Sequence, residues 1–224
     1  MTIARLAGFA RLGLIAGAAI AAVAHAGEPA AVLSGADLIR ALKAGGYTIY
    51  FRHAATDWSQ QDRVGEAGDW LSCDASRMRQ LSAAGRDAAT ALGADIRALD
   101  IPVDRVLASP YCRTVETARL MGLGEVQTTT DVMNMRVAEY FEGRAAIARR
   151  ARRRLAMPPV QGSNTVIVAH GNVALSATGV HLGEGEAAVF RPLGNEGFTI
   201  IGQLTPAEWQ RARQARDASA PSPP

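Results

Sequence analysis

Three short segments carry side chains that could do chemistry on an anionic group. The first, YFRHAATD, contains Arg52 and His53; the second, SPYCRTVETA, contains Arg113; and the third, VIVAHG, contains His170. A guanidinium group matches phosphate oxygens bidentately and stays charged at any working pH. An imidazole can attack phosphorus as a nucleophile. Two histidines and two arginines in one pocket would therefore suit phosphate chemistry.

Each of the three segments follows a run of residues that predicts a β-strand. The runs are 47–51, 105–108 and 165–169, and the last of them, TVIVA, is almost wholly apolar and β-branched, as in a strand covered on both faces. In open α/β sheets, ligands bind outside the carboxyl ends of the strands. We therefore expect the four side chains to converge at one edge of a sheet, although most of the chain lies between the first and the last.

The rest of the chain alternates between helical and strand patterns. Helices are predicted at 36–44, 83–99, 110–121 and 144–156, and further strands at 126–129, 187–191 and 198–203. This alternation predicts an α/β fold, a three-layer α/β/α sandwich with a mainly parallel central sheet. The sequence DASAPSPP at 217–224 predicts a disordered tail.

A long polar segment at 54–75 predicts a loop, and loops of this length inside a compact domain are usually functional. Thr56 and Asp57 come soon after His53, where polar side chains could line a pocket. Trp58 and Trp70 flank the segment. These two either wall the site or pack the loop against the domain, and the sequence leaves both interpretations open.

The three motifs, in this order and each at a strand end, resemble those of the histidine phosphatase superfamily. The usual family pattern is R-H-G, then S-P-x-x-R-x-x-x-T-A, then a late strand that ends on His. The resemblance covers roughly residues 34–204 and implies a phosphoglycerate mutase-like fold, for which we expect one domain at 27–216. The sequence departs from the pattern at Ala54, where the family usually has Gly. Ala is tolerated there if the backbone keeps a negative φ.

The resemblance implies that His53 is the nucleophile that becomes phosphohistidine, and that Arg52, Arg113 and His170 surround the transferred phosphoryl group. It also implies chemistry without a metal ion or cofactor. The phosphoryl transition state spreads negative charge over three oxygens, so catalysis depends on fixed cations and hydrogen-bond donors. One ring nitrogen of His53 must be unprotonated to attack, which requires an acceptor, such as a backbone carbonyl, for the N–H on the other.

The general acid that would protonate an alkoxide leaving group has several candidates. Family members commonly place a Glu some two dozen residues after the Arg of the second motif, and Glu139 lies at about that distance from Arg113. Glu184 and Glu186 follow His170 and precede a predicted strand, and Asp57 follows the first motif. These four carboxylates and a water-assisted mechanism all stay open from the sequence.

The first 26 residues have the pattern of a secretory signal peptide. Arg5 and Arg11 precede an apolar stretch, LGLIAGAAIAAV, and the small-residue site Ala-His-Ala ends at Ala26. The apolar stretch is too short for a membrane-spanning helix. We expect cleavage after Ala26, a mature chain that begins at Gly27 without a spanning segment, and a periplasmic or secreted protein. An uncleaved N-terminal anchor is the alternative.

The two cysteines of the chain are Cys73 and Cys112. An even number of cysteines in an exported protein permits a disulfide, so we expect this pair to form one, with two separate buried thiols as the alternative. The sequence contains neither C-x-x-C nor H-E-x-x-H, so its motifs do not predict a zinc site.

Positive charge is concentrated in the run Arg149–Arg150–Ala151–Arg152–Arg153–Arg154. Cleavage of the leader removes two arginines and no acidic residue, which lowers the formal net charge from +3 to +1. The run lies in a helical pattern without interleaved aromatic residues, which favours a solvated helix face over a polyanion- or lipid-binding patch. We expect no nucleic-acid partner.

Two functions are consistent with these observations. The first is an exported, metal-independent phosphomonoesterase that acts through phospho-His53 on a small or scavenged phosphate ester or on an envelope phosphate. The second is a protein of the same fold that binds phosphate but turns it over weakly or not at all. The second stays open because the sequence does not single out a general acid.

Overall fold

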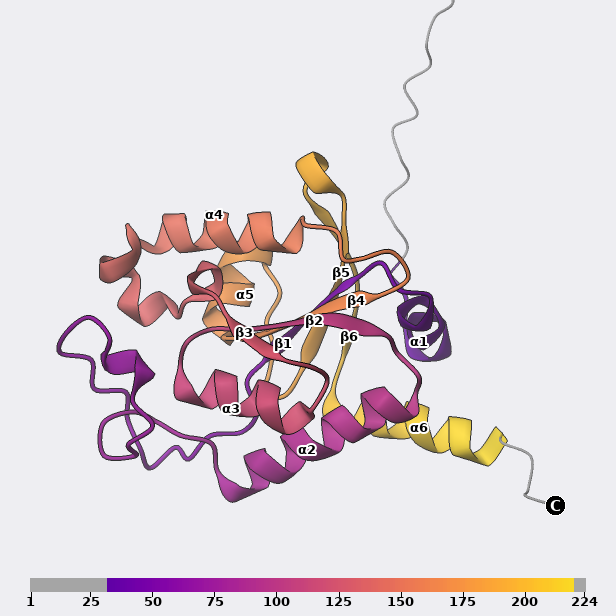
Figure 1. The fold of residues 1–224 in the computed structure, drawn as a ribbon, viewed down its shortest axis with the longest axis horizontal. Helices are drawn as coiled ribbons and strands as arrows, with labels where there is room; N and C mark the ends of the chain where they lie inside the picture. The colour runs from indigo at the N-terminus through magenta and orange to yellow at the C-terminus, as the bar shows by residue number, and fades with distance from the viewer. Residues whose placement is uncertain (1–31, 220–224) are drawn as a thin grey trace, which may run out of the picture.

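The computed structural model describes residues 32–219, which form one six-stranded sheet flanked by helices (Figure 1). The sheet order is β3-β2-β4-β1-β5-β6. All pairings among β1 to β4 are parallel, whereas β5 is antiparallel to both β1 and β6. The strand bounds are β1 Thr48–Arg52, β2 Val103–Ala108, β3 Val126–Thr128, β4 Asn164–Ala169, β5 Ala187–Pro192 and β6 Phe198–Leu204.

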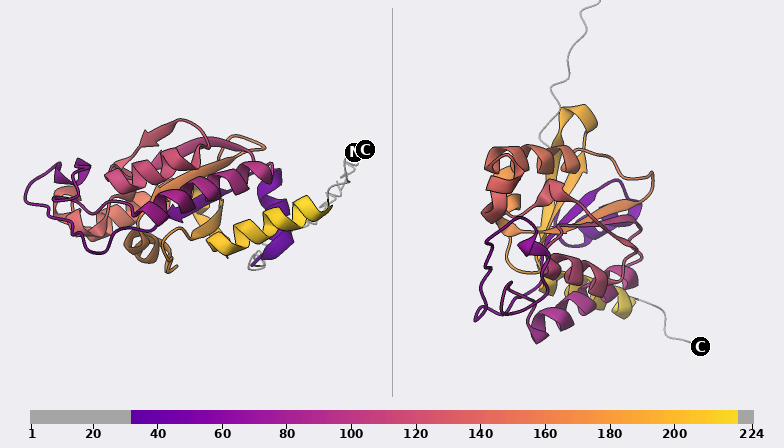
Figure 2. Two further views of the ribbon diagram at one scale, coloured as in Figure 1. Left: turned by 90° about the horizontal axis from the view of Figure 1, so that it is seen from below. Right: turned by 60° about the vertical axis from the view of Figure 1, so that its left-hand side comes forward.

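Helices cover both faces of this sheet, which confirms the predicted three-layer sandwich (Figures 1 and 2). One face carries α1 Gly35–Ala44, α2 Ala83–Ala98, α3 Cys112–Met121 and α6 Pro206–Ser219. The other carries α4 Arg144–Leu155 and α5 Gly171–Thr178, together with the 3-10 segment η3 Met135–Phe141. Three shorter 3-10 segments complete the elements: η1 Asp69–Leu71, η2 Thr130–Val132 and η4 Gly194–Glu196.

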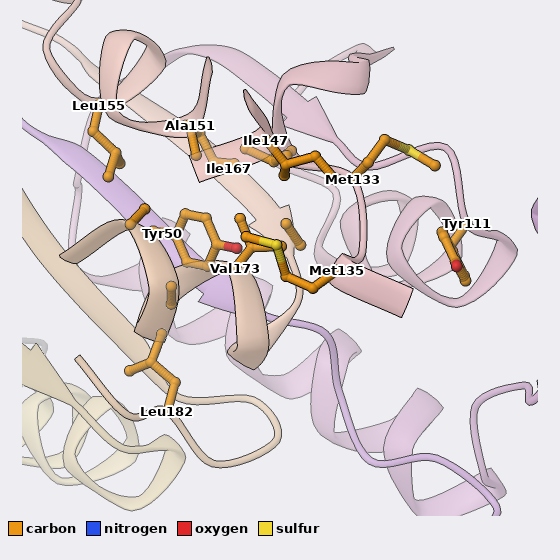
Figure 3. Close-up of a cluster of buried hydrophobic side chains, with 14 of the residues drawn as sticks. Tyr50, Tyr111, Met133, Met135, Ile147, Ala151, Leu155, Ile167, Val173 and Leu182 are labelled. Atoms are coloured by element: carbon orange, nitrogen blue, oxygen red, sulfur yellow. The ribbon is translucent and has the colours of Figure 1, made fainter. Parts of the chain in front are cut away.

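The central strand β4 is buried on both faces, as its apolar sequence predicts. Its six residues are all buried, and alternate side chains enter different cores because successive residues of a strand point to opposite faces. Ile167 packs with Tyr50 against α4 and α5 (Figure 3). Val166 and Val168 join the core on the opposite face. The strand that ends at the third motif is thus anchored from both sides.

The pairing register aligns the carboxyl ends of the strands that carry the motifs. Arg52, the last residue of β1, is opposite Ala169, the last residue of β4. On the other side of β4, Ala108 of β2 is opposite Val168. The residues that follow β1, β2 and β4 therefore emerge next to one another at a single edge of the sheet.

The Cys73–Cys112 disulfide is present, as expected from the sequence, with a Cα–Cα distance of 5.4 Å. It joins the long loop between β1 and α2, residues 53–82, to the first residue of α3. In Figures 1 and 2 the loop projects at one end of the molecule. An isolated β-bridge between Thr56 and Leu81 closes its base. The loop is therefore tied at its base and at its middle.

The C-terminal part of the chain differs from the prediction. Residues 206–219 form α6, which the sequence patterns did not predict. The disordered tail expected from residue 217 is therefore wrong at its start, because Asp217 lies in this helix. The helix forms because Thr205 and Glu208 make reciprocal capping hydrogen bonds at its start and because Trp209 is fully buried against Phe51. This capping box was the sequence signal that could have revealed α6.

The start of α3 also differs slightly from the prediction. The helix begins at Cys112 rather than at Pro110, because Tyr111 has an extended backbone and acts as the N-cap. No helix in residues 32–219 is long and apolar enough to cross a membrane. The expected signal peptide and its cleavage site after Ala26 lie outside the described residues.

Candidate active site

The two motif histidines lie side by side at the carboxyl edge of the sheet. The backbone N–H of His53 donates to the carbonyl of Ala169, at 2.9 Å, which continues the β1–β4 ladder by one residue. The rings of His53 and His170 are 5.7 Å apart between centroids, with an angle of 70° between their planes. The predicted convergence of these two residues is therefore observed, and it follows from parallel strand pairing.

His53 is held in one tautomer by its own segment of backbone. Its Nδ1 lies 2.9 Å from the carbonyl oxygen of Ala54. A carbonyl oxygen only accepts, so Nδ1 carries the proton and Nε2 keeps its lone pair. Burial, together with the charge of Arg113, lowers the pKa of His53 to about 3. Ala54 does not have a positive φ, which is why alanine is tolerated at this position.

His170 is fixed by a residue from the third strand of the edge. Its Nε2 lies 2.9 Å from Oγ of Ser109, which directly follows β2. The Nδ1 atom is buried and has no hydrogen-bond partner among the described residues. Burial is the main cause that lowers the pKa of His170 well below its usual value, with the charge of Arg113 next. The ring is therefore neutral, and its buried Nδ1 keeps unused hydrogen-bonding capacity.

Arg52 lines the pocket beside the histidines and is oriented from the segment after α5. Its guanidinium donates to the carbonyl oxygen of Leu182, at 3.0 Å. Nη2 of Arg52 also lies 3.6 Å from a carboxylate oxygen of Glu184. That carboxylate in turn accepts from the hydroxyl of Thr56, at 2.7 Å. Glu184 thus links Arg52 to Thr56, and neither Thr56 nor Glu184 is among the described residues that line the pocket.

Arg113, which is predicted to surround a phosphoryl group, is paired with a carboxylate in the structure. Its side chain is only 1% exposed and makes a bidentate ion pair with Asp62, at 2.9 and 3.0 Å. It also donates to the carbonyl oxygen of Arg79. Its Nε is buried without a hydrogen-bond partner among the described residues. Arg113 therefore lies behind the wall of the site, where its charge still acts on both histidines.

A pocket of about 270 Å³ opens over these groups. Its lining residues come from β1, the long loop, η3 and the α5 region, and they are Arg52, His53, Arg79, Asn134, Arg136, His170, Gly171, Asn172, Leu175, His181 and Leu182. Three of the four predicted site residues line this pocket. Two of the arginines that line it, Arg79 and Arg136, were not predicted.

Arg79 reaches the pocket because the long loop folds back on itself. Its backbone N–H donates to Asp62, and the carbonyl of Gln80 accepts from the N–H of Asp57. Its guanidinium lies 4.0 Å above the ring of Trp58, an exposed side chain. Trp70, in contrast, is buried against Phe141 and packs the loop down. The loop length signalled function, but its internal pairing has no sequence signature.

Arg136 is positioned by a short network at the start of η3. The side chain of Asn134 accepts from the backbone N–H of Arg136, at 3.0 Å. The same oxygen accepts from Nδ2 of Asn172, which lies in the first turn of α5, at 2.8 Å. This network ties η3 to the helix that follows His170. Arg136 could have been noticed as a cation near Glu139, but nothing in its spacing ties it to the three motifs.

Among the four carboxylates proposed as the general acid, none is part of the pocket wall. Glu139 lies on η3 with an exposed side chain. Asp57 accepts from Ser59 and Gln60, and these hydrogen bonds, that from the Ser59 side chain first, lower its pKa. Glu186 accepts from the backbone N–H of Gly183, at 2.7 Å.

Glu184 is the carboxylate of this group that contacts a residue of the pocket wall, through the 3.6 Å approach to Arg52. Its side chain is 16% exposed. Both of its oxygens face Thr56, since one accepts from the hydroxyl and the other lies 3.4 Å from the backbone nitrogen. Among residues 32–219, His, Cys, Asp and Glu side chains do not gather in groups of three or more that could hold a metal ion.

Solved structures that are similar to this chain include two phosphatases and one candidate phosphatase. A candidate α-ribazole-5'-P phosphatase from Escherichia coli K-12 is 17% identical over 69% of this chain and 94% of its own, with a TM-score of 0.50. The protein histidine phosphatase SixA, complexed with tungstate, is 14% identical over 72% and 97%, with a TM-score of 0.46. A mycobacterial glucosyl-3-phosphoglycerate phosphatase is 15% identical over 64% and 89%, with a TM-score of 0.45.

A comparison with curated proteins found no significant match. The sequence of residues 49–158, however, matches the histidine phosphatase superfamily (branch 1). This segment begins in β1, includes Arg52, His53 and Arg113, and extends past α4. Together with the six-stranded, mostly parallel sheet, it shows that the chain belongs to the histidine phosphatase superfamily.

Proposed function

We propose that this protein is a metal-independent phosphatase that transfers a phosphoryl group from its substrate to Nε2 of His53 and then to water. The observation that carries the proposal is the 2.9 Å contact between Nδ1 of His53 and the carbonyl of Ala54, which leaves the Nε2 lone pair available beside a cationic pocket. Membership of the superfamily supports phosphatase chemistry in general.

The neighbouring groups suit the charge that develops during such a transfer. Arg52 lines the pocket and can hold phosphoryl oxygens bidentately, and His170 lines it beside His53. Gly171 and Asn172, the first residues of α5, also line the pocket, and the N-terminus of a helix favours an anion. Arg113 contributes its charge from behind the wall. Fixed groups of this kind stabilise the transition state without reorganising.

We also propose that the protein works outside the cytoplasm. Support comes from the leader-like sequence that ends at Ala26 and from the disulfide between Cys73 and Cys112, a bond typical of oxidising compartments. In this setting the substrate is a scavenged small phosphate compound or a phosphate of the cell envelope.

A phosphate-binding protein without turnover is the second candidate. The observation that favours it is the absence of a carboxylate from the described pocket wall, since an alkoxide leaving group needs a proton donor. The two candidates agree on the ligand and differ only in whether His53 becomes phosphorylated.

Hydrolysis of p-nitrophenyl phosphate in the presence of EDTA tests the proposal. The wild-type protein should release nitrophenolate, and His53→Ala and His53→Asn should both abolish release while keeping the wild-type circular dichroism spectrum. Brief reaction followed by denaturation should trap an acid-labile, base-stable phosphate on His53, located by mass spectrometry.

Two outcomes would overturn the proposal of a phosphatase that acts through His53. One is phosphate binding without any release of nitrophenolate between acidic and neutral pH, which would leave the binding protein. The other is undiminished release by the folded His53 variants, which would move the nucleophile elsewhere.

A further inference from the structure

The wall of the active-site pocket is cationic and lacks a carboxylate in the part of the chain that the structure describes. Its charged side chains are Arg52, Arg79 and Arg136, and its other polar side chains are histidines and asparagines. The carboxylates that contact residues of this wall are already paired. Asp62 is paired with the buried Arg113, and Glu184 accepts from the hydroxyl of Thr56 and lies 3.6 Å from Nη2 of Arg52.

This wall has a consequence for the leaving group of the reaction. An alkoxide is a strong base and must receive a proton as its bond to phosphorus breaks, a task for a positioned acid. A phosphate group leaves as a stable anion and needs no such proton, because its second pKa is about 6. A pocket with cations and no acid therefore favours a leaving group that is itself an anion.

We propose that the substrate is a phosphoanhydride, and that the enzyme removes the terminal phosphoryl group of a diphosphate. This proposal rests on the phosphatase function proposed above and specifies its substrate class. Arg52, His53 and His170 hold the terminal phosphoryl group. Arg79 and Arg136 bind the second phosphate, which is the leaving group.

The geometry at Arg136 fits this task. Its backbone is held by Asn134, which is bonded to Asn172 at the start of α5, so the residue sits on a fixed base. Its side chain has no hydrogen bond or ion pair within residues 32–219 and is exposed at the pocket. A guanidinium that no carboxylate occupies can bind two oxygens of a phosphate side by side.

Arg79 provides the second cation. Its side chain is held over Trp58, at 4.0 Å from the ring centroid, and its Nε is buried with no hydrogen-bond partner in the described part of the chain. The long loop and η3 thus each contribute one arginine to the pocket, in addition to Arg52 from β1. Three arginines in one wall carry enough positive charge for two adjacent phosphates.

The proposed reaction has two balanced steps. The Nε2 lone pair of His53 attacks the terminal phosphorus, a P–N bond forms, and the bridging P–O bond breaks with its electron pair leaving on the second phosphate. Throughout the reaction, Nδ1 keeps its proton and donates it in a hydrogen bond to the carbonyl oxygen of Ala54. Water then attacks the phosphohistidine, the P–N bond breaks, and the electron pair returns to Nε2 while both hydrogens of the water leave with orthophosphate.

A leaving-group series tests the substrate class. The probes are p-nitrophenyl phosphate, phenyl phosphate, glycerol phosphate and inorganic diphosphate, all in EDTA. We expect kcat/KM to fall steeply as the leaving oxygen becomes more basic, by more than about 100-fold from nitrophenolate to the alkoxide, since this is the range that a general acid supplies. Diphosphate should react faster than a phosphate ester whose leaving group has a similar pKa.

Variants separate the second-phosphate site from general effects. Arg136→Gln should lower the ratio of kcat/KM for diphosphate to that for p-nitrophenyl phosphate by about tenfold or more, as expected for a hydrogen bond to a charged group. Arg149→Gln, on the exposed face of α4, should leave this ratio unchanged. Glu184→Gln should lower all four rates in parallel without changing their dependence on the leaving group.

Three results would overturn the substrate class while leaving the phosphatase in place. These are glycerol phosphate turnover within about tenfold of p-nitrophenyl phosphate, which would require a general acid, a steeper leaving-group dependence in Glu184→Gln, or diphosphate turnover no faster than the ester trend. A protein that hydrolyses none of the probes and forms no phosphohistidine would instead contradict the proposed function itself.

Discussion

At the scale of single residues, the site depends on two histidines that are kept neutral by burial. His53 and His170 are 3% and 1% exposed, and both lie near Arg113, whose charge opposes a second positive charge. A neutral imidazole is what a nucleophile requires, so the low pKa serves the proposed chemistry. The same burial must lower the stability of the fold in acid.

We predict that the free energy of unfolding falls as the pH decreases from about 6.5 towards 3. Below the unfolded pKa of about 6.5, both histidines bind a proton in the unfolded chain but not in the native one, so acid favours unfolding. Each contributes up to about 1.4 kcal/mol per pH unit, because one pKa unit corresponds to that energy. Urea unfolding at pH 7, 6 and 5 measures the slope before most carboxylates titrate.

Two variants assign this slope to its source. His170→Asn should reduce the pH dependence by about half, since one of the two proton sites is gone. His181→Gln removes an exposed histidine and should leave the slope unchanged. A wild-type stability that is constant between pH 7 and 5 would show that the buried rings take up protons in the native state as readily as in the unfolded chain.

At the scale of elements, α2 is packed so closely against its neighbours that two of its positions exclude any side chain. A Cβ atom on Gly85 would lie 1.9 Å from the carbonyl oxygen of Ala55, and one on Gly93 would lie 1.8 Å from that of Met121. The first contact presses α2 against the chain just after His53. The second sets the distance between α2 and α3, whose first turn carries Arg113.

We predict that Gly93→Ala destabilises the protein although alanine is the better helix former. The added methyl group meets a backbone atom that cannot rotate away, so α2 and α3 must separate, at a cost of about 1–3 kcal/mol. Thermal and urea unfolding measure the loss. Thr90→Ala, at an exposed position of the same helix, should change stability by less than about 0.5 kcal/mol. Equal effects of the two substitutions would contradict the close approach.

The arginines at positions 149–154 of α4 do not all have the same role, because some make hydrogen bonds or ion pairs with neighbouring segments. Arg152 donates to the carbonyl of Ala177 in α5, and Arg154 pairs with Asp131. Arg149 and Arg153 are exposed. Part of the run therefore holds α4 in place, and part forms the solvated face that the sequence predicted.

At the scale of the whole molecule, the disulfide connects the long loop to the sheet edge on which the site is built. Cys73 lies in the same loop as Asp62 and Arg79, and Cys112 is the first residue of α3, next to Arg113. The bond thus joins the two segments that meet behind the pocket wall. Constraining the loop limits the freedom of the unfolded chain and also keeps the cationic wall in place.

We predict that loss of this disulfide lowers both stability and activity. Cys73→Ser/Cys112→Ser should lose about 3–4 kcal/mol of unfolding free energy, the value that chain entropy gives for a loop of this length. Proteolysis should then begin within the loop, and KM should rise more than kcat falls, since Arg79 belongs to binding. The wild-type protein treated with dithiothreitol should behave like the double variant, and full stability after reduction would contradict this role.

The sequence by itself determined the fold class and which histidines meet at one edge of the sheet. Apolar, β-branched runs and helical spacing are local patterns, and each motif follows directly on its strand, so His53 and His170 could be assigned to one edge of the sheet without a structure. The cysteine pair was predictable for another reason: the chain has two cysteines, so only one pairing within it exists. The capping box of α6 was local too and was overlooked.

Only the tertiary structure decided which charged groups face the pocket. Arg113 belongs to the second motif, yet its guanidinium is paired with Asp62 from the long loop. Arg79 and Arg136 belong to no motif, yet they line the pocket wall. The candidate acids were likewise sorted by contacts with partners far away in the chain, such as Thr56 for Glu184. The pairing of charges depends on distances through space, and spacing along a chain specifies these only within a single helix or strand.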